Sequence, residues 1–102
     1  MNFDQLRRYV PELFQIAQKY GILRIFVFGS IARGADSQND VDFLVEMQEG
    51  ATLFGAAGFG YESEKLLGIP VDIIPLSILP GICDKEFVLA IQREAIPLWK
   101  LS

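Results

Sequence analysis

The sequence contains no histidine and a single cysteine, Cys83, among its 102 residues. Without histidine, neither a Ser-His-Asp nor a Cys-His catalytic arrangement can form, and zinc sites with histidine ligands are excluded. One cysteine cannot make a disulfide within the chain, which favours a reducing, cytoplasmic setting. Proton transfer near neutral pH must then rely on a carboxylate, Lys, Tyr, Cys or water. The chemistry that remains is catalysis by acidic residues together with a metal ion.

Long apolar runs and an excess of positive charge are also missing. No run approaches the roughly 18 apolar residues of a membrane span. The charged residues Asp4, Arg7 and Arg8 interrupt any signal-peptide pattern at the N-terminus. A net charge of −4 argues against a surface that binds nucleic acid directly. We therefore expect one soluble domain over residues 1–102 that works in the cytoplasm and binds neither a membrane nor nucleic acid.

Acidic residues are concentrated in the middle of the chain. Residues 36–72 carry eight Asp or Glu and, as the single basic residue, Lys65. Such a segment suits cation binding, and it equally describes a solvated acidic face. Sequence context separates its members, since Asp40, Asp42 and Asp72 stand among strand-forming apolar residues and the other acids do not. These three aspartates are therefore the candidates for a site.

The order of apolar segments and breakers predicts an α+β fold, with a small mixed sheet of three or four strands and helices packed on it. The glycines at 55, 58 and 60 weaken one helical segment, which we expect to be short, bent or mobile. Its aromatic residues Phe54, Phe59 and Tyr61 are predicted to be core. The predicted helices are 3–9, 11–20, 52–67 and 85–95, with a helical turn at 30–34 and a turn at 80–81; the predicted strands are 22–28, 41–46 and 70–74, with 97–99 as a short edge strand.

Residues 28–45 contain the most informative motif of the chain. An apolar strand ends in Gly29-Ser30, and Asp40-Val41-Asp42 begins the next strand. Backbone N–H groups in a glycine turn can approach an anion such as a phosphate. Side chains two residues apart on a strand share a face, so Asp40 and Asp42 present paired carboxylates that favour a hard cation. We expect Gly29 and Ser30 to hold terminal phosphates and Arg33 to neutralise their charge.

Asp72 is the third element, in a strand that we predict to be mostly buried. If strand 70–74 lies beside strand 41–46, Asp72 joins Asp40 and Asp42 around one site. Three carboxylates would hold one or two Mg²⁺ ions, the arrangement used for displacement at phosphorus. Taken singly, each feature has an ordinary explanation, such as an exposed edge-strand acid or a surface salt bridge for Arg33. The joint pattern favours nucleotidyl or phosphoryl transfer.

These blocks resemble the minimal nucleotidyltransferases of the DNA polymerase β superfamily. The resemblance rests on residues 28–34, 39–46, 66–72 and 91–98. It implies the polymerase β palm-like fold, phosphate binding by Gly29 and Ser30, Mg²⁺ binding by Asp40 and Asp42, and Asp72 as the third catalytic acid. The chain departs from the family between Ser30 and Asp40, where nine residues stand in place of ten and Asn39 replaces a usual serine.

The same resemblance implies a function and a partner. Small members of this family are antitoxins that transfer AMP from an NTP, here ATP, to a tyrosine of an all-helical HEPN toxin and so silence it. We expect an Mg²⁺-dependent adenylyltransferase of this kind. The alternatives are a non-catalytic antitoxin that neutralises its partner by contact, transfer to a small hydroxylated molecule, and a nucleotide-binding regulator. High hydropathy in so small a chain would fit a homodimer or a hetero-oligomer with the partner.

Overall fold

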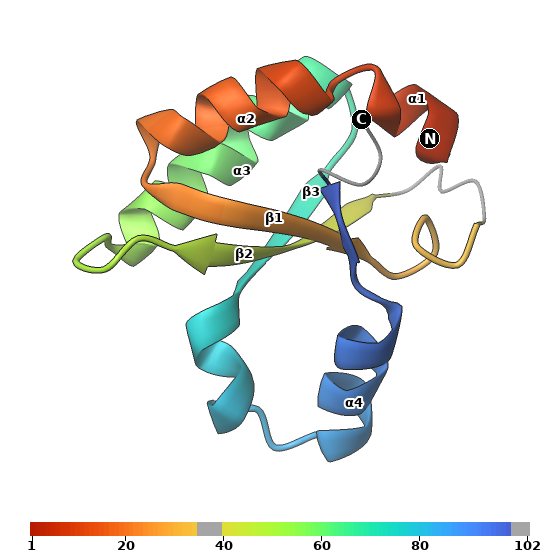
Figure 1. Ribbon diagram of the computed structural model, residues 1–102, viewed down its shortest axis with the longest axis vertical. Helices are drawn as coiled ribbons and strands as arrows, with labels where there is room; N and C mark the ends of the chain where they lie inside the picture. Colours follow the sequence, from red (N-terminus) through yellow and green to blue (C-terminus); the bar gives the residue numbers. More distant parts are fainter. Residues whose placement is uncertain (35–39, 99–102) are drawn as a thin grey trace.

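The computed structural model describes residues 1–34 and 40–98, which form a four-stranded sheet with helices on both faces (Figure 1). The observed elements belong to the predicted α+β class. In chain order they are α1 (Phe3–Arg7), α2 (Val10–Lys19), β1 (Ile22–Phe28), β2 (Val41–Met47), α3 (Leu53–Leu67), β3 (Val71–Pro75), the short 3-10 helix η1 (Leu76–Gly81), α4 (Lys85–Glu94) and β4 (Ile96–Pro97).

The strand order is β3-β2-β1-β4. Strand β1 runs antiparallel to both β2 and β4, whereas β2 and β3 are parallel and are joined by the crossover helix α3. The sequence order of an apolar strand, a long helical segment and a second apolar strand is the one that a parallel pair such as β2 and β3 requires. The expectation that strands 41–46 and 70–74 are neighbours is therefore confirmed.

Alternation along the strands divides the apolar residues between two clusters. On one face, Val27, Phe43 and Val45 pack with residues of α1, α2 and α3. On the other face, Phe28 and Leu44 pack with Leu79 of η1 and Ile91 of α4. Figure 1 shows this division, with α1, α2 and α3 on one side of the sheet and η1 and α4 on the other. Since strand residues alternate between faces, Asp42 and Asp72 point to the same face as Phe28 and Leu44.

The chain between β3 and the end of β4 follows the prediction with small shifts. The turn expected at 80–81 lies within η1, and helix 85–95 is observed as Lys85–Glu94. Asp84 caps α4 by accepting a hydrogen bond from the Phe87 N–H at 3.1 Å. The edge strand expected at 97–99 is present as β4, and Trp99 lies outside the described residues.

Helix α3 keeps almost its whole predicted length of 52–67 despite its glycines. It runs without interruption from Leu53 to Leu67, so the expectation that the glycines shorten it is wrong. A Cβ on Gly55 would lie 2.6 Å from the backbone oxygen of Tyr20, and a Cβ on Gly58 would overlap the Tyr20 ring. These glycines therefore allow α3 to pack closely against the end of α2, and tertiary contact offsets their low helix propensity.

The aromatic residues of α3 fall into two groups. Phe59 is fully buried and its ring lies 6.1 Å from that of Phe43, as predicted for a core residue. Phe54 and Tyr61 are 84% and 60% exposed, so the prediction that they are core is wrong. The cause is helical periodicity, because the face that carries Phe59 is turned to the sheet and the opposite face is turned to solvent.

Within the described residues, no helix has both the length and the apolar character needed to cross a bilayer.

The close approach of α3 to Tyr20 makes Gly55→Ala destabilising. At an exposed helical position this change gains about 1 kcal/mol from helix propensity. Here we expect a net loss of about 1–3 kcal/mol, because the new Cβ meets a backbone oxygen that cannot rotate away. Urea denaturation at equilibrium measures the free energy of unfolding.

The matched control is Ala57→Gly on the exposed side of the same helix. It should cost about 1 kcal/mol through propensity alone. A Gly55→Ala protein more stable than the wild type would show that the close approach does not constrain α3.

Candidate active site

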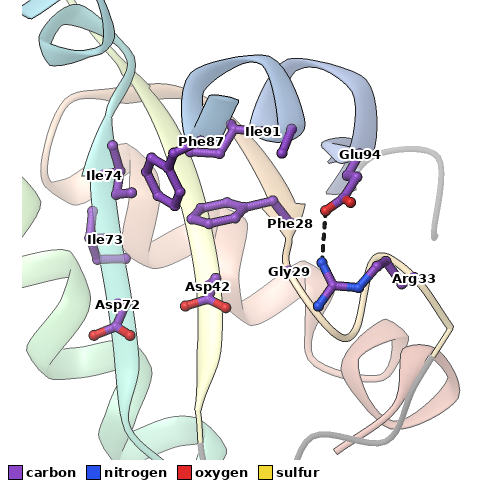
Figure 2. A pocket seen from close by; sticks show the side chains of 11 residues that line it. Phe28, Gly29, Arg33, Asp42, Asp72, Ile73, Ile74, Phe87, Ile91 and Glu94 are labelled. Atoms are coloured by element: carbon purple, nitrogen blue, oxygen red, sulfur yellow. Dashed lines mark hydrogen bonds and ion pairs between the residues drawn. The ribbon is translucent and has the colours of Figure 1, made fainter. Parts of the chain in front are cut away.

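Three aspartates from two neighbouring strands meet at one end of the sheet. Asp40 directly precedes β2, Asp42 is the second residue of β2, and Asp72 is the second residue of β3. The parallel register places Asp42 opposite Asp72, and Figure 2 shows their carboxylates side by side. One oxygen from each of the three aspartates lies within 4.8 Å of the others. The predicted meeting of the three carboxylates is present, and their roles are taken up below.

A glycine turn lies against these carboxylates. Phe28, the last residue of β1, pairs with Asp42, so Gly29 follows directly beside the Asp42 side chain. Gly29 has a φ of +76°, and a Cβ at this position would overlap the carboxylate oxygen of Asp42. Only a glycine satisfies both conditions without strain. The turn continues in helical form, with the Arg33 N–H donating to the Gly29 carbonyl at 3.2 Å.

The site has an excess of negative charge. Partial burial is the main cause that raises the pKa of Asp42 from 3.8 to about 6, and the charges of Asp40 and Asp72 act in the same direction. The positive charge of Arg33 opposes this shift. A hydrogen bond with Asp72 is the main cause that raises the pKa of Asp40. Asp40 and Asp42 thus keep their protons to a higher pH than isolated aspartates, and carboxylate oxygens are the donors that Mg²⁺ prefers.

A cavity of about 570 Å³ opens beside the carboxylates (Figure 2). Asp42, Asp72, Gly29 and Arg33 line one part of it. The rest is lined by apolar side chains of the sheet and of α4, among them Phe28, Ile74, Phe87 and Ile91, and by Glu94. The cavity therefore has a charged end and an apolar wall, the combination typical of small-molecule sites.

The other predicted positions differ in detail. Ser30 follows Gly29 in the turn and is half-buried, but it is not among the residues that line the cavity. Asp72 is exposed, so the prediction that it is mostly buried is wrong. Strand β3 is the edge strand of the sheet, and its first residues extend beyond the apolar cluster that η1 and α4 form with the sheet. The shortened segment between Ser30 and Asp40, including Asn39, lies largely outside the described residues.

Helix α4 contributes residues that sequence reasoning did not assign to a site. Phe87 and Ile91 both line the cavity, where Phe87 is 40% exposed and Ile91 is buried. Glu94 forms an ion pair with Arg33, with 2.9 Å between Oε2 and Nη1. The helical spacing of Phe87 and Ile91 signals packing against a neighbour but no cavity, and nothing in the local sequence marks Glu94.

Comparison with known proteins places this geometry in a family. The model of the nucleotidyltransferase domain family matches residues 4–96. A candidate protein adenylyltransferase of Methanocaldococcus jannaschii is 36% identical over 87 residues, which are 83% of this chain and 90% of that protein. The protein adenylyltransferase MntA of Thermococcus cleftensis is 36% identical over 66 residues, which are 64% and 67% of the two chains.

Solved structures share the fold. A candidate minimal nucleotidyltransferase superposes with a TM-score of 0.76 at 35% identity, covering 95% of this chain and 96% of the other. The MNT antitoxin bound to tri-AMPylated HEPN toxin of Shewanella oneidensis gives a TM-score of 0.61 at 15% identity, covering 93% and 71%. The first likeness supports common descent, and the second shows the fold alone.

The overlap with Asp42 means that Gly29→Ala should lower the free energy of unfolding more than the same change at a glycine without such a neighbour. A left-handed φ costs an alanine about 1–2 kcal/mol, and here the Cβ also displaces the carboxylate. The control is Gly34→Ala, because Gly34 has a φ of +85° with nothing near its Cβ position.

Chemical denaturation of both variants gives the two losses in free energy of unfolding. We expect Gly29→Ala to lose more, and the excess to vanish when Asp42→Ala is added. Equal losses for the two single variants would contradict a specific contact between Gly29 and Asp42.

The raised pKa of Asp42 predicts how the effect of Asp72→Asn on stability depends on pH. Between the ordinary value of 3.8 and the folded value of about 6, the folded chain holds a proton that the unfolded chain has released. The metal-free protein therefore loses stability as pH rises through this window. Removing the Asp72 charge, directly opposite Asp42, should then stabilise the metal-free protein by about 0.5–1 kcal/mol at neutral pH.

Thermal unfolding in the presence of a chelator, followed from acid to neutral pH, measures this effect. The gain should shrink as pH falls below the Asp42 pKa. Glu49→Gln, at an exposed acid in the same segment, should change little at any pH. An Asp72→Asn protein that is less stable at neutral pH without metal would refute the repulsion.

Proposed function

The chain belongs to the nucleotidyltransferase domain family, and we propose that it transfers AMP from ATP to a tyrosine hydroxyl of a HEPN-type toxin. Pyrophosphate is the second product. Modification would silence the toxin, which makes this chain the antitoxin of a two-protein module. The observation that carries the proposal is the group of three carboxylates beside a glycine turn and a cavity.

The relatives support the transfer reaction and the partner. Two sequence relatives that share 36% identity with this chain carry the name of protein adenylyltransferase. A protein of the same fold occurs in complex with a HEPN toxin that bears three AMP groups. A protein acceptor also suits the site itself, because Asp72 is exposed on an edge strand where a second protein can reach it.

The cavity provides a separate place for each part of ATP. The N–H groups of the turn at Gly29 and Ser30, together with the Arg33 guanidinium, would hold the phosphates. The apolar wall, with Phe28 of β1 and Phe87 of α4, would receive the adenine ring by stacking. The α-phosphate then lies between the turn and the carboxylates, where the reaction takes place.

The donor set fits Mg²⁺, as argued above from its oxygen ligands and retained protons. Asp40, Asp42 and Asp72 would hold it, as one ion or as two. When bound, Mg²⁺ supplies positive charge that offsets the negative charge on the phosphate oxygens and on departing pyrophosphate. Asp40 and Asp42 would thereby help to orient the nucleotide, and the Gly29 turn lies directly against the Asp42 carboxylate.

The transfer step is a displacement at the α-phosphorus. The tyrosine oxygen forms a bond to this phosphorus, and the bond to the oxygen that bridges to the β-phosphate breaks. The electron pair of the broken bond leaves with pyrophosphate. Asp72 would accept the tyrosine proton, because its carboxylate is the exposed member of the cluster and lies beside Asp42.

Asp42→Asn should abolish AMP transfer while leaving the fold intact. The test incubates the purified chain and its candidate toxin partner with Mg²⁺ and ATP labelled at the α-phosphate. We expect label on the toxin with the wild type and a loss of at least about a hundredfold in rate with the variant. Glu49→Gln is the matched control and should label the toxin at the wild-type rate, since this acid lies outside the cavity.

The same variants distinguish catalysis from neutralisation by contact. If AMP transfer is required, Asp40→Ala and Asp42→Ala will fail to protect cells from the toxin although each still binds it. Protection by both variants, with no label on the toxin, would contradict the proposed reaction and establish a contact antitoxin. The large exposed side chains Leu53, Phe54 and Tyr61 would then be the first surface to examine.

A further inference from the structure

An ion pair joins the phosphate-binding turn to the end of the last helix. Arg33 lies four residues after Gly29, and Glu94 is the final residue of α4. Their contact is 2.9 Å between Nη1 and Oε2, with side-chain exposures of 57% for Arg33 and 32% for Glu94. Both residues line the cavity, and Figure 2 shows the guanidinium beside Gly29 with Glu94 on α4 facing it. The pair thus connects two segments that are 61 residues apart.

Glu94 occupies a well-determined position. The Ala95 N–H donates to the Ile91 carbonyl at 2.9 Å and closes the last turn of α4. Two residues after Glu94, Ile96 pairs with Val27 of β1. Ile91, one turn earlier, is buried against the sheet. The backbone of Glu94 is therefore held between a packed helical turn and a strand pairing, and from this position its carboxylate reaches Arg33.

Arg33 stands between two sources of negative charge. One is Glu94, and the other is the carboxylate cluster, because the charge of Arg33 acts on Asp42. Without Glu94, the long Arg33 side chain would be drawn into an ion pair with Asp42 or into solvent, and in either case its guanidinium would no longer be held beside the turn for the β- and γ-phosphates. The carboxylate of Glu94 instead holds the guanidinium beside Gly29, in the lining of the cavity.

We propose that Glu94 is a positioning residue for ATP, which orients the Arg33 guanidinium toward the β- and γ-phosphates at the mouth of the cavity. This inference rests on the proposed function. Glu94 does not contact the nucleotide, because its charge would repel a phosphate. One nitrogen of Arg33 meets Glu94, and a guanidinium carries five N–H donors in a fixed plane, so others remain to bind phosphate oxygens.

The test measures binding rather than turnover. Isothermal titration in Mg²⁺ compares two ligands, adenosine and an ATP analogue whose α,β-bridging oxygen is replaced by a methylene group. The proteins are wild type, Glu94→Ala, Glu94→Gln, Arg33→Ala and the double variant Arg33→Ala/Glu94→Ala. Arg93→Ala, at the exposed neighbouring position on α4, is the matched control.

We expect Glu94→Ala to weaken binding of the analogue by about five- to tenfold, as for the loss of a charge-assisted contact. Glu94→Gln should lose less, because its amide oxygen still accepts a hydrogen bond from Arg33. Adenosine, which has no phosphates, should bind all proteins alike. In the Arg33→Ala background, Glu94→Ala should cause no further loss.

Four results would overturn the inference. Equal weakening of adenosine, or an additive loss in the double variant, would show that Glu94 only supports the packing of α4. Tighter binding of the analogue by Glu94→Ala would show that Glu94 withholds Arg33 from the nucleotide. If Glu94→Ala bound the ATP analogue with wild-type affinity, Glu94 would have no role in positioning Arg33. Failure of the wild type to bind the analogue would instead contradict the proposed function on which this inference rests.

Discussion

The structure holds two like charges opposite each other on adjacent parallel strands, and the site depends on that constraint. The register of β2 and β3 places Asp42 opposite Asp72, and Asp40 lies two residues before Asp42, just ahead of β2. Such an arrangement opposes folding, since carboxylates at this distance repel and hold protons. The backbone ladder and the buried side chains on the opposite face maintain it, among them Val41, Phe43 and Val71. Folding thus brings together three carboxylates that would otherwise stay apart.

Because side chains alternate along the strands, the two faces of the sheet differ in what they carry. The face toward α1, α2 and α3 is filled by large apolar residues, and it carries the larger of the two clusters. The face toward α4 has a small cluster centred on Phe28 and Leu44, which leaves room for a cavity. One side of the single sheet therefore carries the main core, and the other side carries a small cluster and the cavity.

In two places a glycine allows two segments to pack closely, rather than making the chain flexible. Gly29 lets the turn after β1 touch the Asp42 carboxylate, and Gly55 lets α3 pack on the backbone of Tyr20. Local propensity predicts a weak helix around Gly55, but the contact with α2 overrides it. In the same way, Phe54 and Tyr61 are apolar enough for a core, yet their side of α3 has no element of this chain against it within the described residues. Propensity and hydrophobicity describe a residue, whereas packing depends on what lies opposite.

By itself, the sequence determined the order of helices and strands, the α+β class, and the three aspartates with Gly29 and Arg33 as the candidate site. These features follow from local periodicity, from turn chemistry and from the cost of placing carboxylates in apolar strands, all of which can be read within short segments. Only the tertiary structure decided that Asp72 is exposed, that α3 is continuous, and that Phe87 and Glu94 of α4 complete the cavity. Each of these depends on which residues far apart in the chain come within contact distance, and no local pattern records that distance.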